Sequence, residues 1–510
     1  MNSLATRQLT IFAFAVLISL LGGCGGGSSP TPPPPPAAKF SNASLSGQYA
    51  FSMSGSEACA DVSSYFTRAG AFFADGKGNI TAGLEDINAC TGVATLQFTG
   101  GKYSIAADGR GTLQLTNSTG ATNYSIVLSS MAAGSIVQTD PTATASGSFQ
   151  HQNAAAFSNA AIAGGFVFHL SGVDVSGTSI NPGSYVGRFD ADGAGAIFNG
   201  LFDSNIGGTL SGQQLFPTGA SYRLATSGEG TTFGRGTANI AGRSFVFYIV
   251  DATRVTLIGT DFPSAFIGEA FAQQNTAFTT ASLTGSFSFL IGGWSSSGPI
   301  SSAGRFTADG AGNISNIVLD ENNTGSIASL PNGGVSGTFA VDANQFGGGT
   351  ITWTDTNVGS FSFVFYLISP MQAVFQETDS AIVSDGILMA QTTTPISAAA
   401  LAGGYTLGWT GVSGDEKDFV GQFNLTSSGS LSGTIDINEF GASKQFFDVP
   451  LNGNLTLRGD GTQANTLDAD LHTVPGPILH FTAYVVNQNT LLLVGVDSDR
   501  VLAGTLTRQP

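Results

Sequence analysis

Hydrophobic and polar residues alternate along most of this chain, in short runs that glycine-rich turns separate. Near the start of the first block of runs, Tyr49, Phe51 and Met53 alternate with Ala50 and Ser52. A period of two is typical of a strand that buries one face and exposes the other. No run in the block has the period of a helix. The runs between turns predict eight strands, at residues 47–53, 65–74, 79–87, 96–106, 111–117, 122–130, 134–139 and 146–152.

This block occurs four times. The glycine of the tetrad Ala69-Gly70-Ala71-Phe72 recurs at positions 187, 304 and 421, an advance of 117 residues each time. Such regular spacing predicts tandem domains. We number them repeat 1 (residues 40–153), repeat 2 (154–275), repeat 3 (276–394) and repeat 4 (395–510). Each copy closes with a glycine that is followed five residues later by a glutamine, and these glutamines are Gln152, Gln273, Gln391 and Gln509.

The joins between repeats are short and equal. Ten residues lead from each closing glutamine to the first apolar residue of the next copy, at Ile162, Leu283 and Leu401. Equal joins predict a fixed packing between neighbouring repeats rather than a loose string of domains.

The turns between strands favour one topology. The turn Asp75-Gly76-Lys77-Gly78-Asn79 has counterparts that begin at Asp192 and Asp309, and Asp-Gly turns commonly join adjacent antiparallel strands. Eight sequential strands with short hairpins predict an all-β fold with an up-and-down β-barrel in each repeat, which closes on itself. The alternative is a tandem array of immunoglobulin-like β-sandwiches, which would need Greek-key connections.

The first residues predict export and a membrane anchor. Residues 9–21 form an apolar run after Arg7, which suits a signal-peptide core and is too short for a membrane span. The run ends in Leu21-Gly22-Gly23-Cys24, which resembles the lipobox of bacterial lipoproteins. That resemblance implies a signal peptide at residues 1–23 and acyl chains on Cys24 that attach the protein to a membrane. The alternative is an ordinary secretory signal with a chance cysteine.

Residues 24–39 are rich in glycine, serine and proline, which predicts a tether. Gly25 follows Cys24, where an aspartate would favour retention in the inner membrane of proteobacteria. The resemblance to lipoproteins therefore implies the outer membrane, with the repeats either periplasmic or exposed on the surface.

Composition limits the partners and the compartment. Charged residues make up 10 % of the chain and hydrophobic residues 42 %, which excludes a disordered chain. The net charge of −17 argues against nucleic acid as a partner. Two cysteines remain besides Cys24, and an even pair in an oxidising compartment predicts a disulfide between Cys59 and Cys90. Both lie in connections that an up-and-down barrel places at the same end.

Two further resemblances concern the repeat itself. Its opening phrase, as in Leu45-Ser46-Gly47-Gln48-Tyr49, is similar to the Gly-x-Trp phrase on the first strand of the calycin superfamily, which includes lipocalins and avidins. This implies an eight-stranded meander. The phrase around Asp75 resembles those of uncharacterised repeat lipoproteins of environmental bacteria, which implies no particular activity.

Polar residues recur where the third and seventh strands end. An Asp-x-Asn motif closes the third strand, an aspartate closes the seventh, and the up-and-down order places both at one rim of the barrel. Either these side chains cap loop backbone, or they form a rim that binds a cation or a hydroxyl-rich ligand. The residues are Asp86, Asn88 and Asp140 in repeat 1, Asp203, Asn205 and Asp261 in repeat 2, Asp320, Asn322 and Asp379 in repeat 3, and Asp436, Asn438 and Asp497 in repeat 4.

Catalytic and metal chemistry have little support in the sequence. The Asp-Gly turns offer oxygens for calcium, but too few for its six to eight ligands, so a turn is the favoured interpretation. The four histidines do not recur at equivalent positions, and no catalytic motif is present. We therefore predict no enzyme, no metal site and no cofactor.

These observations predict a lipid-anchored envelope protein with a non-catalytic binding, adhesion or structural role. Its partner would be an extracellular glycan, a protein or a small apolar ligand. The alternative is a lipocalin-like carrier of small hydrophobic ligands, because eight-stranded barrels hold either packed side chains or one ligand.

Overall fold

The computed structural model describes residues 39–510 except for nine short segments, which are residues 60–61, 178, 275–276, 343–345, 356–358, 392–395, 441–443, 459–464 and 474–477. The expected signal peptide, almost all of the expected tether and Cys24 lie outside the described residues. Within the part of the chain that the structure describes, no helix is both long enough and apolar enough to cross a membrane.

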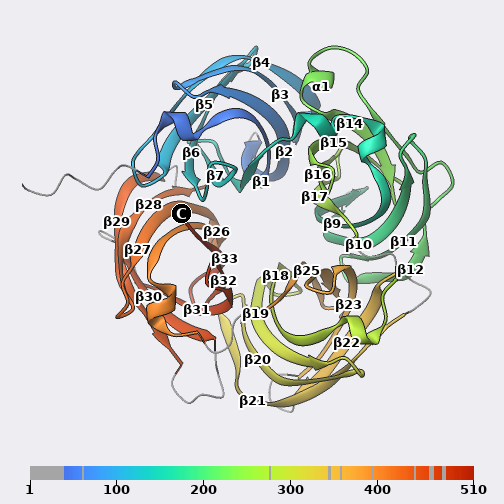
Figure 1. Ribbon diagram of the computed structural model, residues 1–510, viewed down its shortest axis with the longest axis vertical. Coiled ribbons are helices and arrows are strands. Elements are labelled where there is room, and N and C mark those ends of the chain that lie inside the picture. The colour runs from blue at the N-terminus through green and yellow to red at the C-terminus, as the bar shows by residue number, and fades with distance from the viewer. Residues whose placement is uncertain are drawn as a thin grey trace, which may run out of the picture. The chain divides into compact units, whose positions relative to one another are not determined.

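Repeat 1 is an eight-stranded antiparallel barrel (Figure 1). Each strand pairs with the next in sequence, and the first strand also pairs with the last, where Phe51 faces Phe149. This closing pair confirms the predicted up-and-down topology and excludes the sandwich alternative. The strands are β1 (Ser46–Cys59), β2 (Val62–Asp75), β3 (Asn79–Ala89), β4 (Gly92–Ile105), β5 (Arg110–Asn117), β6 (Gly120–Leu128), β7 (Ala133–Asp140) and β8 (Ala143–His151).

Repeats 3 and 4 close in the same way. The strands of repeat 3 are β18 (Thr284–Ser295), β19 (Gly298–Asp309), β20 (Asn313–Asn323), β21 (Ser326–Val341), β22 (Gly348–Asp355), β23 (Gly359–Ser369), β24 (Gln372–Glu377) and β25 (Ile382–Ala390). Those of repeat 4 are β26 (Gly403–Ser413), β27 (Asp415–Leu425), β28 (Ser430–Glu439), β29 (Lys444–Leu457), β30 (Thr466–Thr473), β31 (Ile478–Asn487), β32 (Thr490–Gly495) and β33 (Val501–Arg508).

Repeat 2 departs from the predicted eight strands. Its fourth strand is split in two, so that its sheet has nine strands whose edges, β12 and β13, do not pair with each other. The split falls at residues 216–220, where Pro217 has no N–H to donate and Gly219 has a positive φ of 94°. The strands are β9 (Ala163–Ser176), β10 (Ser179–Asp192), β11 (Ile197–Ile206), β12 (Thr209–Leu215), β13 (Ser221–Leu224), β14 (Arg235–Ile240), β15 (Arg243–Asp251), β16 (Arg254–Gly259) and β17 (Ala265–Ala272).

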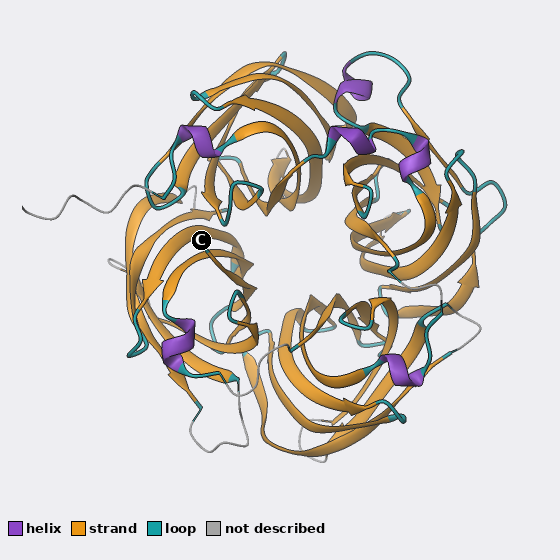
Figure 2. Cartoon of the chain, viewed as in Figure 1, coloured by secondary structure: helices purple, strands orange, loops and turns teal. Residues whose placement is uncertain are grey.

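Among the residues that the structure describes, helical structure is confined to single turns (Figure 2). One α-helical turn, α1 (Glu229–Thr232), lies in repeat 2. Short 3-10 turns precede the first strand of each repeat, namely η1 (Asn42–Ser44), η2 (Ala154–Ala156), η3 (Asn159–Ala161), η4 (Thr280–Ser282) and η5 (Ala398–Leu401).

The inward face of each sheet forms a separate apolar core. In repeat 1, Tyr49, Phe51 and Met53 are buried as their alternation predicts. In repeat 3, the ring of Trp353 lies 5.0 Å from that of Phe363 and 5.3 Å from that of Phe361. Burial of such rings is the dominant favourable contribution to folding.

The outward faces pack one repeat against the next. Strand β2 contacts β16 and β17, β10 contacts β24 and β25, β19 contacts β32 and β33, and β27 contacts β6 and β8. Repeat 4 therefore packs against repeat 1, and the four interfaces, which we call 1–2, 2–3, 3–4 and 4–1, form a closed cycle. A buried apolar cluster spans each interface, as where Ala69 and Ala71 pack with Tyr248.

Candidate functional site

The four asparagines of the Asp-x-Asn motif all bond to the neighbouring repeat. Each donates its side-chain amide to backbone carbonyls that flank the seventh-strand end of that neighbour. The buried amide of Asn322 reaches the carbonyls of Gly495, Asp497 and Arg500 at 2.8–3.0 Å. The other pairs are Asn88 with Gly259 and Ser264, Asn205 with Asp379 and Ile382, and Asn438 with Gln138 and Ala143.

The closing glutamines make a second set of bonds across the same interfaces. The amide of Gln152 donates to the carbonyls of Phe233 and Ile249 in repeat 2. The corresponding acceptors are Phe346 and Leu367 for Gln273, Val485 for Gln391, and Asp108 and Leu128 for Gln509. An amide that satisfies buried carbonyls fixes the orientation of both partners, because leaving those carbonyls unpaired would be costly.

The aspartate of the motif also faces the next repeat. In interface 1–2, Asp86 accepts two bonds from the guanidinium of Arg235, at 2.8 and 2.7 Å, and one from the hydroxyl of Tyr248 at 2.5 Å. In interface 3–4, Asp320 accepts from Arg458 at 2.9 Å and from the hydroxyl of Tyr484 at 2.5 Å. A planar guanidinium is well suited to pair a carboxylate in this way.

Interface 4–1 replaces these partners. Repeat 1 has Val127 where the other repeats have the tyrosine, thirteen residues before the aspartate that ends the seventh strand. Asp436 accepts the backbone N–H of Asp448 at 2.8 Å, and Arg110 of repeat 1 pairs with Asp448 at 2.6 Å. A hydroxyl from repeat 1 also enters this interface, since Thr144 donates to the buried Asp418 at 2.7 Å.

Interface 2–3 retains the tyrosine, but no described arginine or lysine forms an ion pair with the aspartate, and the guanidinium of Arg188, whose charge reaches Tyr366, pairs with Asp190 instead. Asp203, whose residue is 7 % exposed, accepts the hydroxyl of Tyr366 at 2.6 Å and the backbone N–H of Gln213 at 3.0 Å. Burial raises the pKa of Asp203, while both hydrogen bonds lower it. The carboxylate borders a cavity of about 610 Å³ between the two repeats.

The four aspartates predicted to end the seventh strands form hydrogen bonds within their own repeats; Asp140 ends β7, whereas the other three lie two residues after β16, β24 and β32. Asp261 accepts the backbone N–H of Ser244 at 2.8 Å, and Asp379 accepts that of Ala381 at 2.7 Å. Asp140 accepts the amide of Gln138 at 3.0 Å, and Asp497 accepts the backbone N–H of His480 at 3.0 Å. The structure thus brings each Asp-x-Asn motif beside the seventh-strand end of the next repeat rather than that of its own.

The Asp-Gly turns have the geometry of backbone caps. Asp75 accepts the N–H groups of Lys77 and Asn79 at 2.7 and 2.9 Å, and Asp309 does the same for Ala311 and Asn313. Hydrogen bonds from the side-chain amides of Asn79 and Asn313, together with these backbone bonds, lower the pKa of Asp75 and of Asp309 to about 2. Among the residues that the structure describes, no three His, Cys, Asp or Glu side chains are grouped so as to hold a metal ion.

The two remaining cysteines form the predicted disulfide. Cys59 ends β1 and Cys90 lies in the turn after β3, with 6.2 Å between their Cα atoms. Nearby on β3, Glu85 and Asp86 point to opposite faces. Glu85 lies inside the barrel, 3.0 Å from the guanidinium of Arg68, so the two adjacent carboxylates do not meet.

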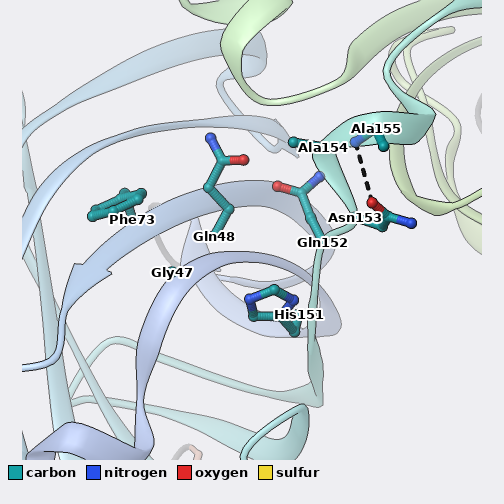
Figure 3. A pocket seen from close by; sticks show the side chains of 8 residues that line it. All are labelled: Gly47, Gln48, Phe73, His151, Gln152, Asn153, Ala154 and Ala155. Atoms are coloured by element: carbon teal, nitrogen blue, oxygen red, sulfur yellow. Dashed lines mark hydrogen bonds between the residues drawn. The ribbon is translucent and has the colours of Figure 1, made fainter.

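A second pocket, of about 470 Å³, lies at the join between repeats 1 and 2 (Figure 3). It is lined by Gln48, Phe73, His151 and the segment from Gln152 to Ala155. The amides of Gln48 and Gln152 are both engaged with backbone carbonyls of repeat 2, at Thr232 and at Phe233 and Ile249. These amides therefore serve the interface rather than the pocket.

Sequence reasoning identified the asparagines and aspartates but missed their tyrosine and arginine partners. Tyr248, Tyr366 and Tyr484 stand at equal spacing before Asp261, Asp379 and Asp497, on the outward face of their strands. A large residue that recurs on an outward face was the available signal.

No protein-family model matches the sequence, and a comparison with curated protein sequences finds no match. Among solved structures, transferrin binding protein B of serogroup B Neisseria meningitidis (isotype 1) is 8 % identical, over 50 % of this chain and 83 % of that one, with a TM-score of 0.19. Transferrin binding protein B of Haemophilus parasuis Hp5, as a Trp-176-Ala mutant, is 10 % identical over 74 % of this chain and 84 % of that one, with a TM-score of 0.21. A DUF3598-family protein of unknown function from Nostoc punctiforme is 10 % identical over 45 % and 99 %, with a TM-score of 0.14. Scores this low establish neither a shared fold nor a shared function.

Proposed function

We propose that this chain is an outer-membrane lipoprotein, anchored through acyl chains on Cys24, whose four repeats act in non-catalytic binding or adhesion. The observation that carries the proposal is that four repeats, joined by a closed cycle of interfaces, follow a lipobox-like sequence in the chain. Each interface is held by an asparagine and a glutamine that reach into the next repeat. A unit whose parts are held in register suits presentation of a surface to a partner, since little ordering entropy remains to be lost on binding.

The barrel interiors favour binding over carriage of an apolar ligand. In each repeat the inward side chains form one continuous buried cluster, and those of repeats 1, 2 and 3 are rich in aromatic rings. In repeat 3, Phe289 contacts both Trp353 and Phe375 across the barrel, at 6.2 and 5.7 Å between ring centroids. Side chains that meet across the interior occupy the space in which a lipocalin-like carrier would hold its ligand.

Anchoring is tested with a Cys24→Ser variant expressed in a Gram-negative host. The unmodified chain should incorporate a labelled fatty acid and fractionate with the outer membrane, whereas Cys24→Ser should do neither. Cys90→Ser is the control, because it replaces a cysteine and breaks the disulfide with Cys59 but leaves the lipobox intact, so labelling should persist. Labelling of Cys24→Ser equal to that of the unmodified chain would refute the anchor.

Exposure and binding need separate measurements. Digestion of the protein on intact cells by an added protease would place the repeats on the surface, and protection until the outer membrane is opened would place them in the periplasm. Mass spectrometry of an organic extract of the purified protein should find no stoichiometric lipid. A bound apolar ligand would instead support the carrier alternative.

A further inference from the structure

The cavity in interface 2–3 lies where equivalent interfaces contain a guanidinium group. Asp86 in interface 1–2 and Asp320 in interface 3–4 are both paired with an arginine of the next repeat. Asp203 is the corresponding residue of interface 2–3, and it accepts from the hydroxyl of Tyr366 as the other two accept from theirs. The tyrosine half of the arrangement is therefore present without the cation.

The strand register shows where the cation is lost. In repeat 2, Arg235 is paired in the ladder with Tyr248. In repeat 3, the residue paired with Tyr366 is Gly348, so Gly348 holds the position of Arg235. In repeat 4 that position is Thr466, and Arg458 reaches Asp320 from just after β29. Thr350 lies two residues beyond Gly348 on the same strand, on the same face, and lines the cavity. A side chain at position 348 would therefore extend along this wall.

A second substitution widens the same space. A hydroxyl on the fourth strand, Thr95 or Ser329, donates to Asp86 or Asp320. In repeat 2 the fourth strand places Gly212 beside Asp203, and a Cβ atom there would lie 3.2 Å from the carboxylate oxygen Oδ1. Relative to interface 1–2, the positions of Arg235 and Thr95 are thus both occupied by glycine in interface 2–3.

The surrounding charge is negative. Repeat 3, at residues 276–394, has eight acidic residues and one basic residue. The basic residue is Arg305, whose positive charge interacts with Tyr484 in interface 3–4. Arg188 of repeat 2 is bonded to Asp190 at 2.6 Å and lies over the ring of Phe346. Asp342 joins Asp203 in lining the cavity. A carboxylate as buried as Asp203 is costly without a counter-charge.

We propose that this cavity binds a guanidinium group, presented either by free arginine or by an arginine side chain of a peptide. A planar fork of N–H donors matches a carboxylate better than a spherical ion does. A calcium ion would need six to eight oxygen ligands, and Asp203 already accepts hydrogen bonds from the Tyr366 hydroxyl and the Gln213 N–H. The site depends on neither Cys24 nor the membrane anchor, so its failure would leave the proposed function standing.

The test is a calorimetric titration of the purified protein with methylguanidinium. Saturable binding at one site per chain is expected, with a Kd of about 1 mM or tighter. Methylurea, which has the same planar shape without the charge, should not bind. Free arginine and the tripeptide Gly-Arg-Gly distinguish the sources, because tighter binding of the tripeptide would indicate a peptide and tighter binding of arginine the free amino acid.

Three variants locate the site. Gly348→Arg should supply the missing side chain from within and weaken methylguanidinium binding at least about tenfold, and Asp203→Asn should weaken it by at least as much. Arg235→Gly should open the equivalent space beside Asp86 and raise the stoichiometry to two sites. This variant shows that the assay detects such a site.

The proposal is overturned if the unmodified protein shows no saturable binding up to about 50 mM methylguanidinium, well above the expected Kd. Equal binding of methylurea, or undiminished binding by Gly348→Arg, would overturn it as well. If Asp203→Asn fails to fold, Gly348→Arg decides alone, since it restores a pair that interface 1–2 already contains.

Discussion

Asn438 joins the last repeat to the first, across 300 residues of sequence, and its removal tests whether the cycle of interfaces is closed. Both hydrogens of its buried amide are used, by the carbonyl of Gln138 at 2.6 Å and by that of Ala143 at 2.9 Å. Asn438→Ala removes both donors and leaves two backbone acceptors without a partner. Asn438→Asp keeps the shape and replaces the donors by acceptors.

The magnitude follows from the two acceptors. A buried polar group left without its partner costs about 1–3 kcal/mol, so two cost about 2–6 kcal/mol, less whatever an entering water recovers. We expect Asn438→Ala to lower the free energy of unfolding by at least about 2 kcal/mol. For a cooperative unit of about 150–250 residues this lowers Tm by roughly 4 °C or more. Asn438→Asp should cost at least as much.

The assay is thermal and denaturant unfolding, together with hydrogen exchange of the backbone at residues 138–143. The matched control is Asn454→Ala, an exposed asparagine on β29 of the same repeat, which should change the unfolding free energy by less than about 0.5 kcal/mol. Exchange should become faster at residues 138–143 in Asn438→Ala alone. Equal stability and equal exchange in the Asn438→Ala and Asn454→Ala proteins would refute the reasoning that this amide holds repeats 4 and 1 together.

Other predictions concern buried groups. Tyr484→Phe removes the hydroxyl that Asp320 accepts at 2.5 Å, and denaturant unfolding should show a loss of about 1.5–3 kcal/mol; an unchanged midpoint would contradict this. Burial raises the pKa of Glu377 from 4.5 to about 8, so its contribution to stability should fall as pH rises from about 4.5 to 8. Glu377→Gln should then unfold at higher temperature than the unmodified chain at pH 8 and above, and a lower Tm there would count against it. Reduction of the disulfide between Cys59 and Cys90 should lower the unfolding free energy of repeat 1 by about 3–4 kcal/mol in the chain-entropy model. Cys59→Ser, which has no disulfide to reduce, is the control, and the reductant should leave its stability unchanged.

The local part of the fold was predictable because it depends on neighbours in sequence. The alternation around Phe51 sets which side chains face the core, and the Asp75 turn sets where a hairpin forms. Both were confirmed, as were the closing pair of strands and the disulfide. The split strand of repeat 2 was not predicted. Pro217 is visible in the sequence, but a proline does not always interrupt a strand, since Pro450 lies within β29.

The candidate site was predictable only as a set of residues. Asn88 and its counterparts stood out by recurrence, and caps for loop backbone were one of the two interpretations. Their partners lie in another repeat, as with Asn438 and Gln138, and no local pattern specifies which of two outward faces meet. The direction of these bonds is a property of the packed repeats.

The sequence by itself determined four β repeats, their strand order, their turns and a lipobox-like start, because period, spacing and turn chemistry act over a few residues. Tertiary structure alone decided that repeat 4 packs against repeat 1 and that the recurring polar residues join neighbours. It also placed Gly348 opposite Tyr366, whose hydroxyl bonds to the buried Asp203 of the neighbouring repeat. Burial and pairing depend on which surfaces contact each other in the folded chain, and the order of the residues alone does not specify those contacts.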